Sequence, residues 1–252
     1  MNVSLIAFTP EPEKIVAAAA KLCYSHSSAS DIMNGLDEES AQRFIDKLMK
    51  LGHASPLEHI SFTFAIDGIS RVLTHQLVRH RIASYSQQSQ RYVKLEQFEY
   101  VIPPAIEKNV EACEIFRNAM KHDQETYEKL VNILEATYVN DYLKKGHSEK
   151  KASALAEKLA IEDARFVFPN ACETKIVVTM NARSLINFFN HRCCNRAQWE
   201  IHEMADEMLK LVKEVSRAVF DKIGPQCLVG PCPEGTMTCG EIIKVREKYV
   251  AL

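Results

Sequence analysis

The sequence predicts an α+β fold, a single helix-rich domain around a central, mostly antiparallel or mixed sheet. The chain has 252 residues, of which 46% are hydrophobic and 25% are charged, a composition typical of a globular protein. Apolar residues recur at helical spacing over most of the chain, and only short segments alternate or are rich in β-branched residues. No Gly-x-Gly-x-x-Gly or Walker loop is present, so no Rossmann unit is expected.

The first third of the chain is predicted to contain two strands and three helices. Residues 3–8 form a short apolar run typical of a strand, and a helix is expected to begin near Pro12. A second helix is expected over residues 37–52, because three acids begin it and a glycine ends it. Residues 62–66 alternate as a half-buried strand does, and residues 73–77 have helical spacing.

The rest of the chain is predicted to be mostly helical. The expected helices cover residues 106–145, as one helix or two, then 148–168, a short segment capped by Asn181, and 197–223. The expected strands cover residues 92–102, which two prolines end, and 174–180, which are rich in β-branched side chains. Residues 1–225 are expected to form one domain, and residues 226–252 a tail that contains cysteines.

We expect a cytoplasmic protein without a membrane partner, because the sequence shows no recognisable targeting signal and its cysteines are typical of reduced thiols. No apolar run reaches the roughly 18 residues of a membrane helix, and the N-terminus does not resemble a signal peptide. The eight cysteines are expected to be reduced thiols, including the adjacent pair Cys193 and Cys194. We expect no metal, although Cys227, Cys232 and Cys239 could bind one if a fourth ligand came from elsewhere. The tail could equally be a subunit contact or a plain terminus.

Acidic residues are missing from two basic segments of a chain whose formal charge is −2. Residues 68–95 contain five cations and no acid, and residues 174–199 contain four cations and no acid. Because a nearby carboxylate would compete for each guanidinium, this pattern indicates an anion site. Two solvent-exposed basic faces are the alternative. Seven of the nine cations are arginines, whose planar group recognises phosphate and stacks on flat rings.

Residues 79–92 carry most of the candidate chemistry. Only two of these fourteen side chains are aliphatic, and the others are mainly hydroxyls, amides and guanidiniums that could hold phosphate oxygens and the edge of a heterocycle. A small phosphorylated ligand is favoured over nucleic acid, because a nucleic-acid-binding domain is usually basic overall. A module that binds single-stranded nucleic acid is the competing interpretation.

Four segments, in order, resemble the flavin-dependent thymidylate synthase family. Arg79-His80-Arg81 followed by Ser89 and Arg91-Tyr92 resembles the RHR-x7-S signature of that family. Residues 53–59 resemble its HxxPxEH segment, residues 181–185 its NARSL segment, and Arg192 with residues 198–200 the stretch that follows. Ser86 and Gln87 stand where many members carry Asn-Glu, which leaves open their hydrogen bonds to the flavin or the nucleotide.

The resemblance implies an enzyme of dTMP biosynthesis that methylates dUMP reductively. The carbon would come from methylenetetrahydrofolate, and the hydride would come from NADPH by way of FAD. The partners would be dUMP, folate and further copies of the chain, in a homotetramer whose active sites are shared between subunits.

The resemblance also implies site residues, with Arg192 as the catalytic group that stabilises an ionised uracil ring. Those expected to contact FAD are His53, Ser55, Arg79, His80, Arg81, Gln87, Asn181, Arg183 and Asn187. Those expected to contact dUMP are Gln76, Arg79, Gln87, Ser89, Gln90, Arg91, Arg165 and Arg192. Ser89 is expected to bind a ligand and not to act as a nucleophile, because a serine needs an adjacent base. His80 is expected to be neutral between two arginines.

Overall fold

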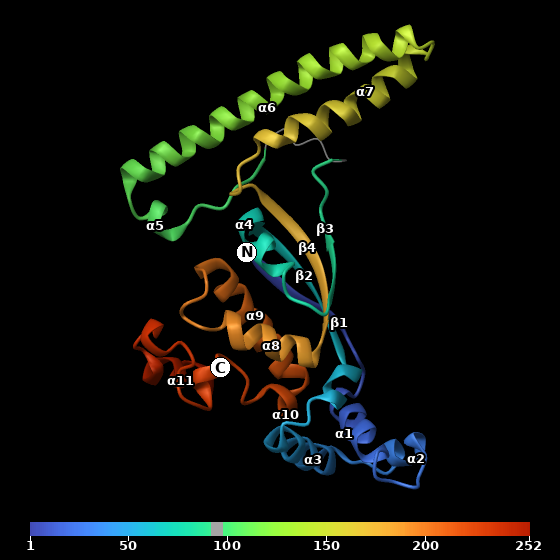
Figure 1. Ribbon diagram of the computed structural model, residues 1–252, viewed down its shortest axis with the longest axis vertical. Coiled ribbons are helices and arrows are strands. Elements are labelled where there is room, and N and C mark those ends of the chain that lie inside the picture. The colour runs from blue at the N-terminus through green and yellow to red at the C-terminus, as the bar shows by residue number, and fades with distance from the viewer. Residues whose placement is uncertain (92–97) are drawn as a thin grey trace. The chain divides into compact units, whose positions relative to one another are not determined.

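A small antiparallel four-stranded sheet lies among many helices in the computed structural model, which describes all residues except 92–97 (Figure 1). The strands follow one another in the order β1 (Asn2–Phe8), β2 (Ser61–Ser70), β4 (Glu173–Asn181) and β3 (Ala83–Gln87). The register of β1 on β2 runs from Asn2 opposite Asp67 to Phe8 opposite Phe62. This architecture confirms the predicted α+β class.

The helices occur between and after the strands. The α-helices are α1 (Pro12–Leu22), α2 (Ala29–Asn34), α3 (Glu38–Leu51), α4 (Arg71–Leu77), α5 (Pro104–Glu107), α6 (Val110–Lys144), α7 (Glu149–Ala164), α8 (Ala182–Arg192), α9 (Trp199–Val215), α10 (Arg217–Phe220) and α11 (Ile242–Ala251). The 3-10 turns are η1 (Ser55–His59), η2 (Arg165–Val167), η3 (Gln226–Leu228) and η4 (Gly235–Met237). None of the described helices is both long enough and apolar enough to cross a membrane.

The described residues divide into two units. Unit 1 contains residues 1–67, 75–86 and 176–252, and unit 2 contains residues 68–74 and 87–175. In unit 2, α6 and α7 pack together, with Tyr127 and Val131 of α6 against Ala160 and Ala164 of α7. Small alanine side chains allow the two helices to approach closely. The expected division into a domain over residues 1–225 and a tail over 226–252 stays a prediction.

An aromatic chain forms part of the core of unit 1. Phe62 of β2 contacts Phe220 of α10 edge to face at 5.4 Å between ring centroids, and Phe220 contacts Phe189 of α8 at 6.1 Å. Phe189 contacts Phe188 at 5.7 Å, and Phe188 contacts the imidazole of His80 at 4.9 Å. The four phenylalanines are fully buried. They therefore link the sheet to the His80 ring through close packing.

Most of the predicted elements are confirmed, with local causes visible at their ends. The expected strands over residues 3–8, 62–66 and 174–180 correspond to β1, β2 and β4. Asp37 caps α3 by accepting a hydrogen bond from the Ser40 amide at 2.7 Å, and Asn181 caps α8 through the Ser184 amide at 2.8 Å. Gly52 ends α3 with a φ of 71°, which a residue without Cβ adopts easily.

Two predicted elements differ from the structure. The helix expected over residues 197–223 is interrupted at Ser216, where φ is −152°, so that α9 and α10 are separate. The strand expected over residues 92–102 falls partly on residues 92–97, outside the described chain. Its described part forms only an isolated bridge between Tyr100 and Cys172, so a strand over residues 98–102 is wrong.

Replacing Phe220 with alanine is expected to lower the free energy of unfolding by about 3–5 kcal/mol, because a fully buried ring leaves a cavity between two aromatic partners. Val250→Ala is the control: Val250 is 80% exposed, and its loss should change stability by less than about 0.5 kcal/mol. Urea unfolding followed by circular dichroism measures both. Equal midpoints for the two variants would contradict this account of the core.

Candidate functional site

Tyr85 fixes the loop that carries Arg79, His80 and Arg81. Its hydroxyl, on β3, lies 2.8 Å from the Leu77 carbonyl and 2.9 Å from the His80 carbonyl, so one O–H proton is shared by two acceptors. Burial raises the pKa of Tyr85 to about 12, which keeps this hydroxyl protonated as a donor. The side chains of Arg79 and Arg81 are exposed, and neither makes a hydrogen bond or ion pair within the described chain.

His80 accepts a hydrogen bond from Arg192, the last residue of α8. The Arg192 Nε donates to the His80 Nε2 at 2.9 Å, which requires an unprotonated Nε2 and places the imidazole proton on Nδ1. Burial, with smaller contributions from the charges of Arg192 and His191, lowers the pKa of His80 to about 4. His80 is therefore neutral at pH 7, as expected, but burial is the larger cause.

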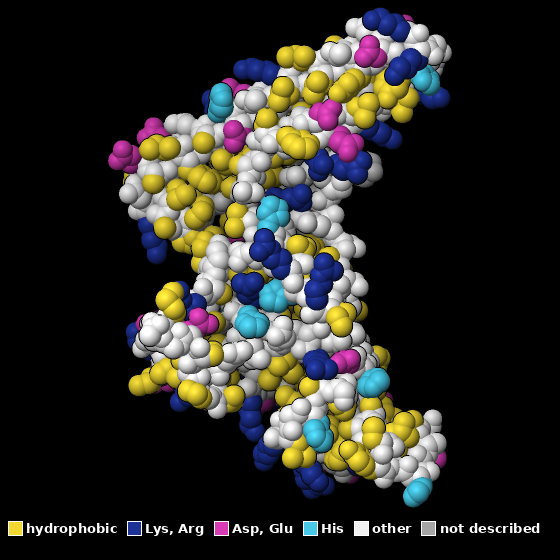
Figure 2. Space-filling view, in the orientation of Figure 1, with side chains coloured by type: hydrophobic (Ala, Val, Ile, Leu, Met, Phe, Trp, Pro, Cys, Tyr) yellow, Lys and Arg dark blue, Asp and Glu magenta, His cyan; other side chains and the backbone are white. Residues whose placement is uncertain are grey.

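A pocket of about 450 Å³ in unit 1 opens beside this pair. Its lining comes from the end of α8, the turn that follows and the C-terminal segment: His80, Asn190, His191, Arg192, Cys194, Arg196, Ala197, Pro225, Gln226, Cys227, Cys232, Pro233 and Glu234. The cationic side chains outnumber the single carboxylate of Glu234. Figure 2 shows basic and histidine side chains close together on the drawn face, with few acidic ones between them. The pocket is therefore suited to an anionic or strongly polar ligand.

Two cysteines of the tail, Cys227 and Cys232, contribute to this pocket wall as thiols. All eight cysteines of the chain are free. Within the described part of the chain, no three His, Cys, Asp or Glu side chains are grouped so that they could hold a metal ion. Cys227 is buried, and burial raises its pKa, with Cys232, Cys194 and Cys239 near enough to add to that shift.

The other residues expected to contact FAD lie at η1 and at α8. His53 and Ser55 are exposed around the start of η1, and Asn187 is exposed on α8. Asn181 uses its side-chain oxygen to cap α8. Arg183 is occupied, because one terminal nitrogen lies 2.5 Å from Glu58 Oε1 in an exposed ion pair.

Five of the residues expected to contact dUMP belong to unit 2. The Gln87 Nε2 donates to the hydroxyls of Thr74 at 3.1 Å and Thr174 at 3.3 Å. The Gln90 Nε2 lies 3.4 Å from the Cys172 sulfur. These contacts hold both amides against β4 and its neighbours.

Arg91 and Arg165 converge on Glu162 at the end of α7. The Arg91 Nε lies 2.7 Å from Glu162 Oε1, and the Arg165 Nε donates to the Glu162 carbonyl at 3.1 Å. Ser89 accepts a hydrogen bond from the Arg91 amide at 3.2 Å. The two arginines thus share one residue whose carboxylate lies where an anion could bind Arg91.

The structure brings some expected site residues into contact and leaves others in separate units. Unit 1 contains Arg192, Gln76, which is half-buried on α4, and all the residues expected to contact FAD except Gln87. Unit 2 contains Gln87, Ser89, Gln90, Arg91 and Arg165. Carboxylates from outside the basic segments pair with two of their arginines, Glu58 with Arg183 and Glu162 with Arg91. The anion site stays a prediction. Sequence reasoning did not single out Tyr85, and it left the role of the tail open. Tyr85 is signalled only as an aromatic residue among small polar ones.

Comparisons with known proteins identify the family. A family model described as thymidylate synthase complementing protein matches residues 4–216. A flavin-dependent thymidylate synthase of Clostridium tetani is 54% identical over 250 residues, which cover 99% of this chain and 97% of that protein. One from Geobacter sulfurreducens is 47% identical over 251 residues, which cover 99% and 98%.

A solved structure supports the fold independently. The UMP/dUMP methylase PolB of Streptomyces cacaoi, bound with 5-Br dUMP, superposes with a TM-score of 0.64. It covers 87% of this chain and 93% of that chain, at 21% identity. The family match over most of the sequence and the two nearly full-length relatives show that this chain belongs to the flavin-dependent thymidylate synthase family.

Proposed function

We propose that this chain methylates dUMP to dTMP, with methylenetetrahydrofolate as carbon donor and NADPH as hydride source. The observation that carries the proposal is the hydrogen bond from Arg192 to a neutral His80 beside a cationic pocket. Membership of the family makes the chain an enzyme of the methyltransferase type that depends on a flavin. The nucleotide, the folate and further copies of the chain in a homotetramer are its proposed partners.

The donor set in unit 1 fits a cofactor that carries phosphates, which supports FAD. Arg79 and Arg81 present exposed guanidiniums, with His53 and Ser55 as further polar groups. Arg183 can join them at small cost, because an exposed ion pair such as that with Glu58 contributes only about 0.2–1 kcal/mol. His80, Asn181 and Asn187 are the other proposed FAD contacts in unit 1, and Gln87 of unit 2 is the remaining residue of the proposed FAD set. Bound FAD would carry the hydride between NADPH and the nucleotide carbon.

Arg192 is suited to stabilise negative charge on the pyrimidine ring. A guanidinium has five N–H groups and keeps its proton at working pH, although burial lowers the pKa of Arg192. The bond to His80 uses the Nε–H, so four N–H groups on the terminal nitrogens remain for the base. A neutral His80 accepts that bond without adding a second positive charge. The pair therefore orients a fixed cation toward the ring.

The phosphate of dUMP is proposed to bind among the arginines and polar groups around Ser89. Within unit 2, Arg91 and Arg165 would supply guanidiniums, and Ser89, Gln87 and Gln90 would supply further donors. Gln76 and Arg79, which belong to unit 1, are proposed dUMP contacts as well. Glu162 holds the Arg91 guanidinium until the phosphate arrives. A dianionic phosphate outcompetes a single carboxylate for a guanidinium, because it offers more charge and three acceptor oxygens.

The direct test is turnover by the purified, FAD-loaded protein. We expect a yellow protein that releases tritium from C5-labelled dUMP only when methylenetetrahydrofolate and NADPH are both present. A colourless protein that does not convert dUMP would contradict the proposal. Binding to single-stranded nucleic acid that weakens steeply with salt and is indifferent to dUMP would favour the competing interpretation.

Arg81→Ala is expected to weaken FAD binding by about tenfold or more, because a guanidinium that contacts phosphate is worth about 1.5–3 kcal/mol. Flavin fluorescence titration measures the dissociation constant. Arg43→Ala is the matched control, since Arg43 is an exposed arginine on α3 paired only with Glu39 within the described chain. Equal FAD affinity in the Arg81 and Arg43 variants would remove Arg81 from the cofactor site.

Arg192→Ala is expected to retain its flavin spectrum while kcat falls by about 10²-fold or more, since a positioned charge acts mainly on the transition state. Arg192→Lys keeps the charge but not the planar group, so it should recover only part of the rate. Steady-state kinetics and the visible spectrum measure the two effects. Wild-type turnover in Arg192→Ala would exclude a catalytic role.

Glu162→Gln is expected to lower KM for dUMP by about two- to fivefold at unchanged kcat, because it removes an exposed carboxylate that competes for Arg91 at about 0.2–1 kcal/mol. Glu157→Gln, on the same helix and exposed, should leave KM unchanged. A higher KM in the Glu162 variant would show that the carboxylate orders Arg91 for the nucleotide and does not compete with it.

A further inference from the structure

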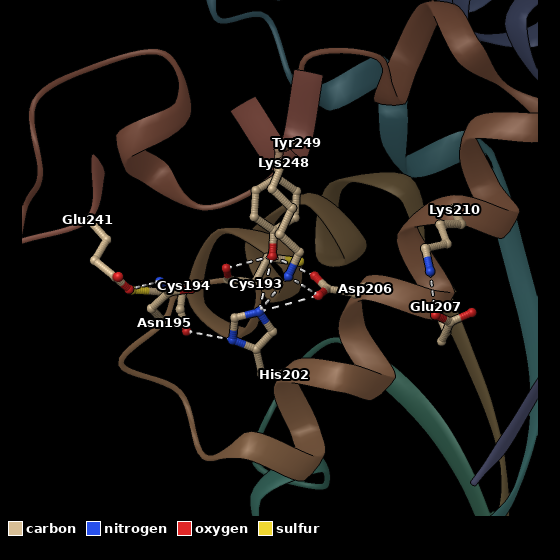
Figure 3. A network of polar contacts seen from close by, with 10 residues as sticks. All are labelled: Cys193, Cys194, Asn195, His202, Asp206, Glu207, Lys210, Glu241, Lys248 and Tyr249. Atoms are coloured by element: carbon tan, nitrogen blue, oxygen red, sulfur yellow. Dashed lines mark hydrogen bonds and ion pairs between the residues drawn. The ribbon is translucent and has the colours of Figure 1, made fainter. Parts of the chain in front are cut away.

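The turn Cys193–Asn195, directly after Arg192, is held by three contacts (Figure 3). The Tyr249 hydroxyl donates to the Cys193 carbonyl at 2.8 Å, and the His202 Nδ1 lies 3.1 Å from the Cys194 carbonyl. The Asn195 side-chain amide donates to Glu241 at 3.2 Å. Carbonyls at a helix C-terminus lack partners within the helix, so such donors fix the chain where it leaves α8.

These contacts around residues 193–195, made by Tyr249, His202 and Glu241, are called the clamp below. Tyr249 of α11 is its buried centre. Its side chain is fully buried, and the single proton of its hydroxyl is shared between the Cys193 carbonyl and Asp206 Oδ1 on α9, which lies 2.5 Å away. Lys248 donates to the other carboxylate oxygen of Asp206, and His202 Nε2 lies 3.3 Å from that oxygen. Burial and the nearby Cys193 and Asp206 raise the pKa of Tyr249, so its hydroxyl stays a donor.

The carboxylate of Asp206 is the fixed charge of the clamp. Burial acts to raise its pKa, but the hydrogen bonds from His202, Lys248 and Tyr249 outweigh burial and leave the pKa lowered. The residue is therefore ionised near neutral pH and holds the hydroxyl of Tyr249 in place. Tyr249, Lys248 and Glu241 all lie beyond residue 216, where the family model ends.

We propose that Tyr249 is a positioning residue that, through the Cys193 carbonyl, fixes the end of α8 and holds the Arg192 guanidinium against His80. The inference rests on the proposed role of Arg192. Arginine has several rotatable bonds, so the direction of its guanidinium depends on where its backbone is anchored. The backbone of Arg192 is anchored by the hydrogen bond from Tyr249 to the carbonyl of the next residue, Cys193. Its guanidinium is anchored by the hydrogen bond from Nε to His80. Displacing a reacting group by about 1 Å can cost a large factor in rate.

Tyr249→Phe tests the proposal, because it keeps the ring and removes only the hydroxyl. We expect kcat to fall by about tenfold while KM for dUMP changes by less than about twofold, since the displaced group acts mainly in the transition state. A purely structural role would lower stability, and at a temperature where the variant is folded it would leave kcat unchanged.

A second measurement reads the position of Arg192 without any turnover. His80 faces the Phe188 ring and the charges of Arg192 and His191, and its pKa rises when Arg192 moves away. NMR titration of the imidazole, assigned with a His80→Gln variant, should show an increase of roughly half a unit in Tyr249→Phe. If the wild-type protein does not convert dUMP, the proposed function fails, and this titration still decides the clamp.

Tyr138→Phe is the matched control, because Tyr138 on α6 also bonds a carboxylate, that of Asp163, at 2.6 Å. It should leave kcat and the His80 titration unchanged. A folded Tyr249→Phe protein with wild-type kcat and wild-type His80 titration would overturn the proposal. If Tyr249→Phe does not fold, Glu241→Ala releases Asn195 at the exposed end of the clamp. That variant must then show the same two changes, smaller in size, and no change in either would overturn the proposal.

Discussion

The hydrogen bond from the Arg192 Nε to a neutral His80 is the interaction on which the candidate chemistry depends. It exists only while the imidazole is unprotonated, because a protonated ring has no acceptor. Burial is the main cause of that neutrality, and the Phe188 ring provides part of the burial. The packing of Phe188 in turn depends on the aromatic chain to Phe220 and Phe62. The hydrophobic core therefore sets a protonation state, and that state sets the direction of a cation.

The arginines of the two basic segments are in two electrostatic states. The guanidiniums of Arg183 and Arg91 are paired with Glu58 and Glu162, whereas those of Arg79 and Arg81 have no hydrogen-bonded partner within the described chain. Paired guanidiniums repel one another less in the free protein, and exposed pairs of this kind dissociate at little cost. A polyanionic ligand can exchange with these carboxylates, while unpaired guanidiniums supply its net attraction. Paired and unpaired arginines therefore contribute differently to affinity.

Local patterns predicted much of the fold but not the contacts of the site. Capping residues such as Asp37 and Asn181 and the alternation in β2 act over a few residues, so the sequence displays them directly. Strand β3 was missed because its side chains are mostly small and polar, and α11 because only Val245 and Tyr249 of it are buried. Arg183 and Glu58 are 125 positions apart, and no local pattern joins them. Which residues contact the ligands stays a prediction from the family motifs, and tertiary packing decides which of those residues meet.

The C-terminal segment belongs to the candidate site because it contacts the surroundings of Arg192 in two ways. Residues 225–227 and 232–234 help to line the pocket, and Tyr249 holds the turn that follows α8. The strength of this hold depends on pH through Asp206. Its pKa is lower in the folded protein than the ordinary value, so its stabilising contribution is complete above the ordinary aspartate pKa near 4. That contribution decreases as the pH falls through the lowered folded value. Protonation of His80, whose pKa is about 4, breaks its bond to Arg192 in an overlapping range. Acid therefore weakens both anchors of Arg192, one at the backbone and one at the guanidinium.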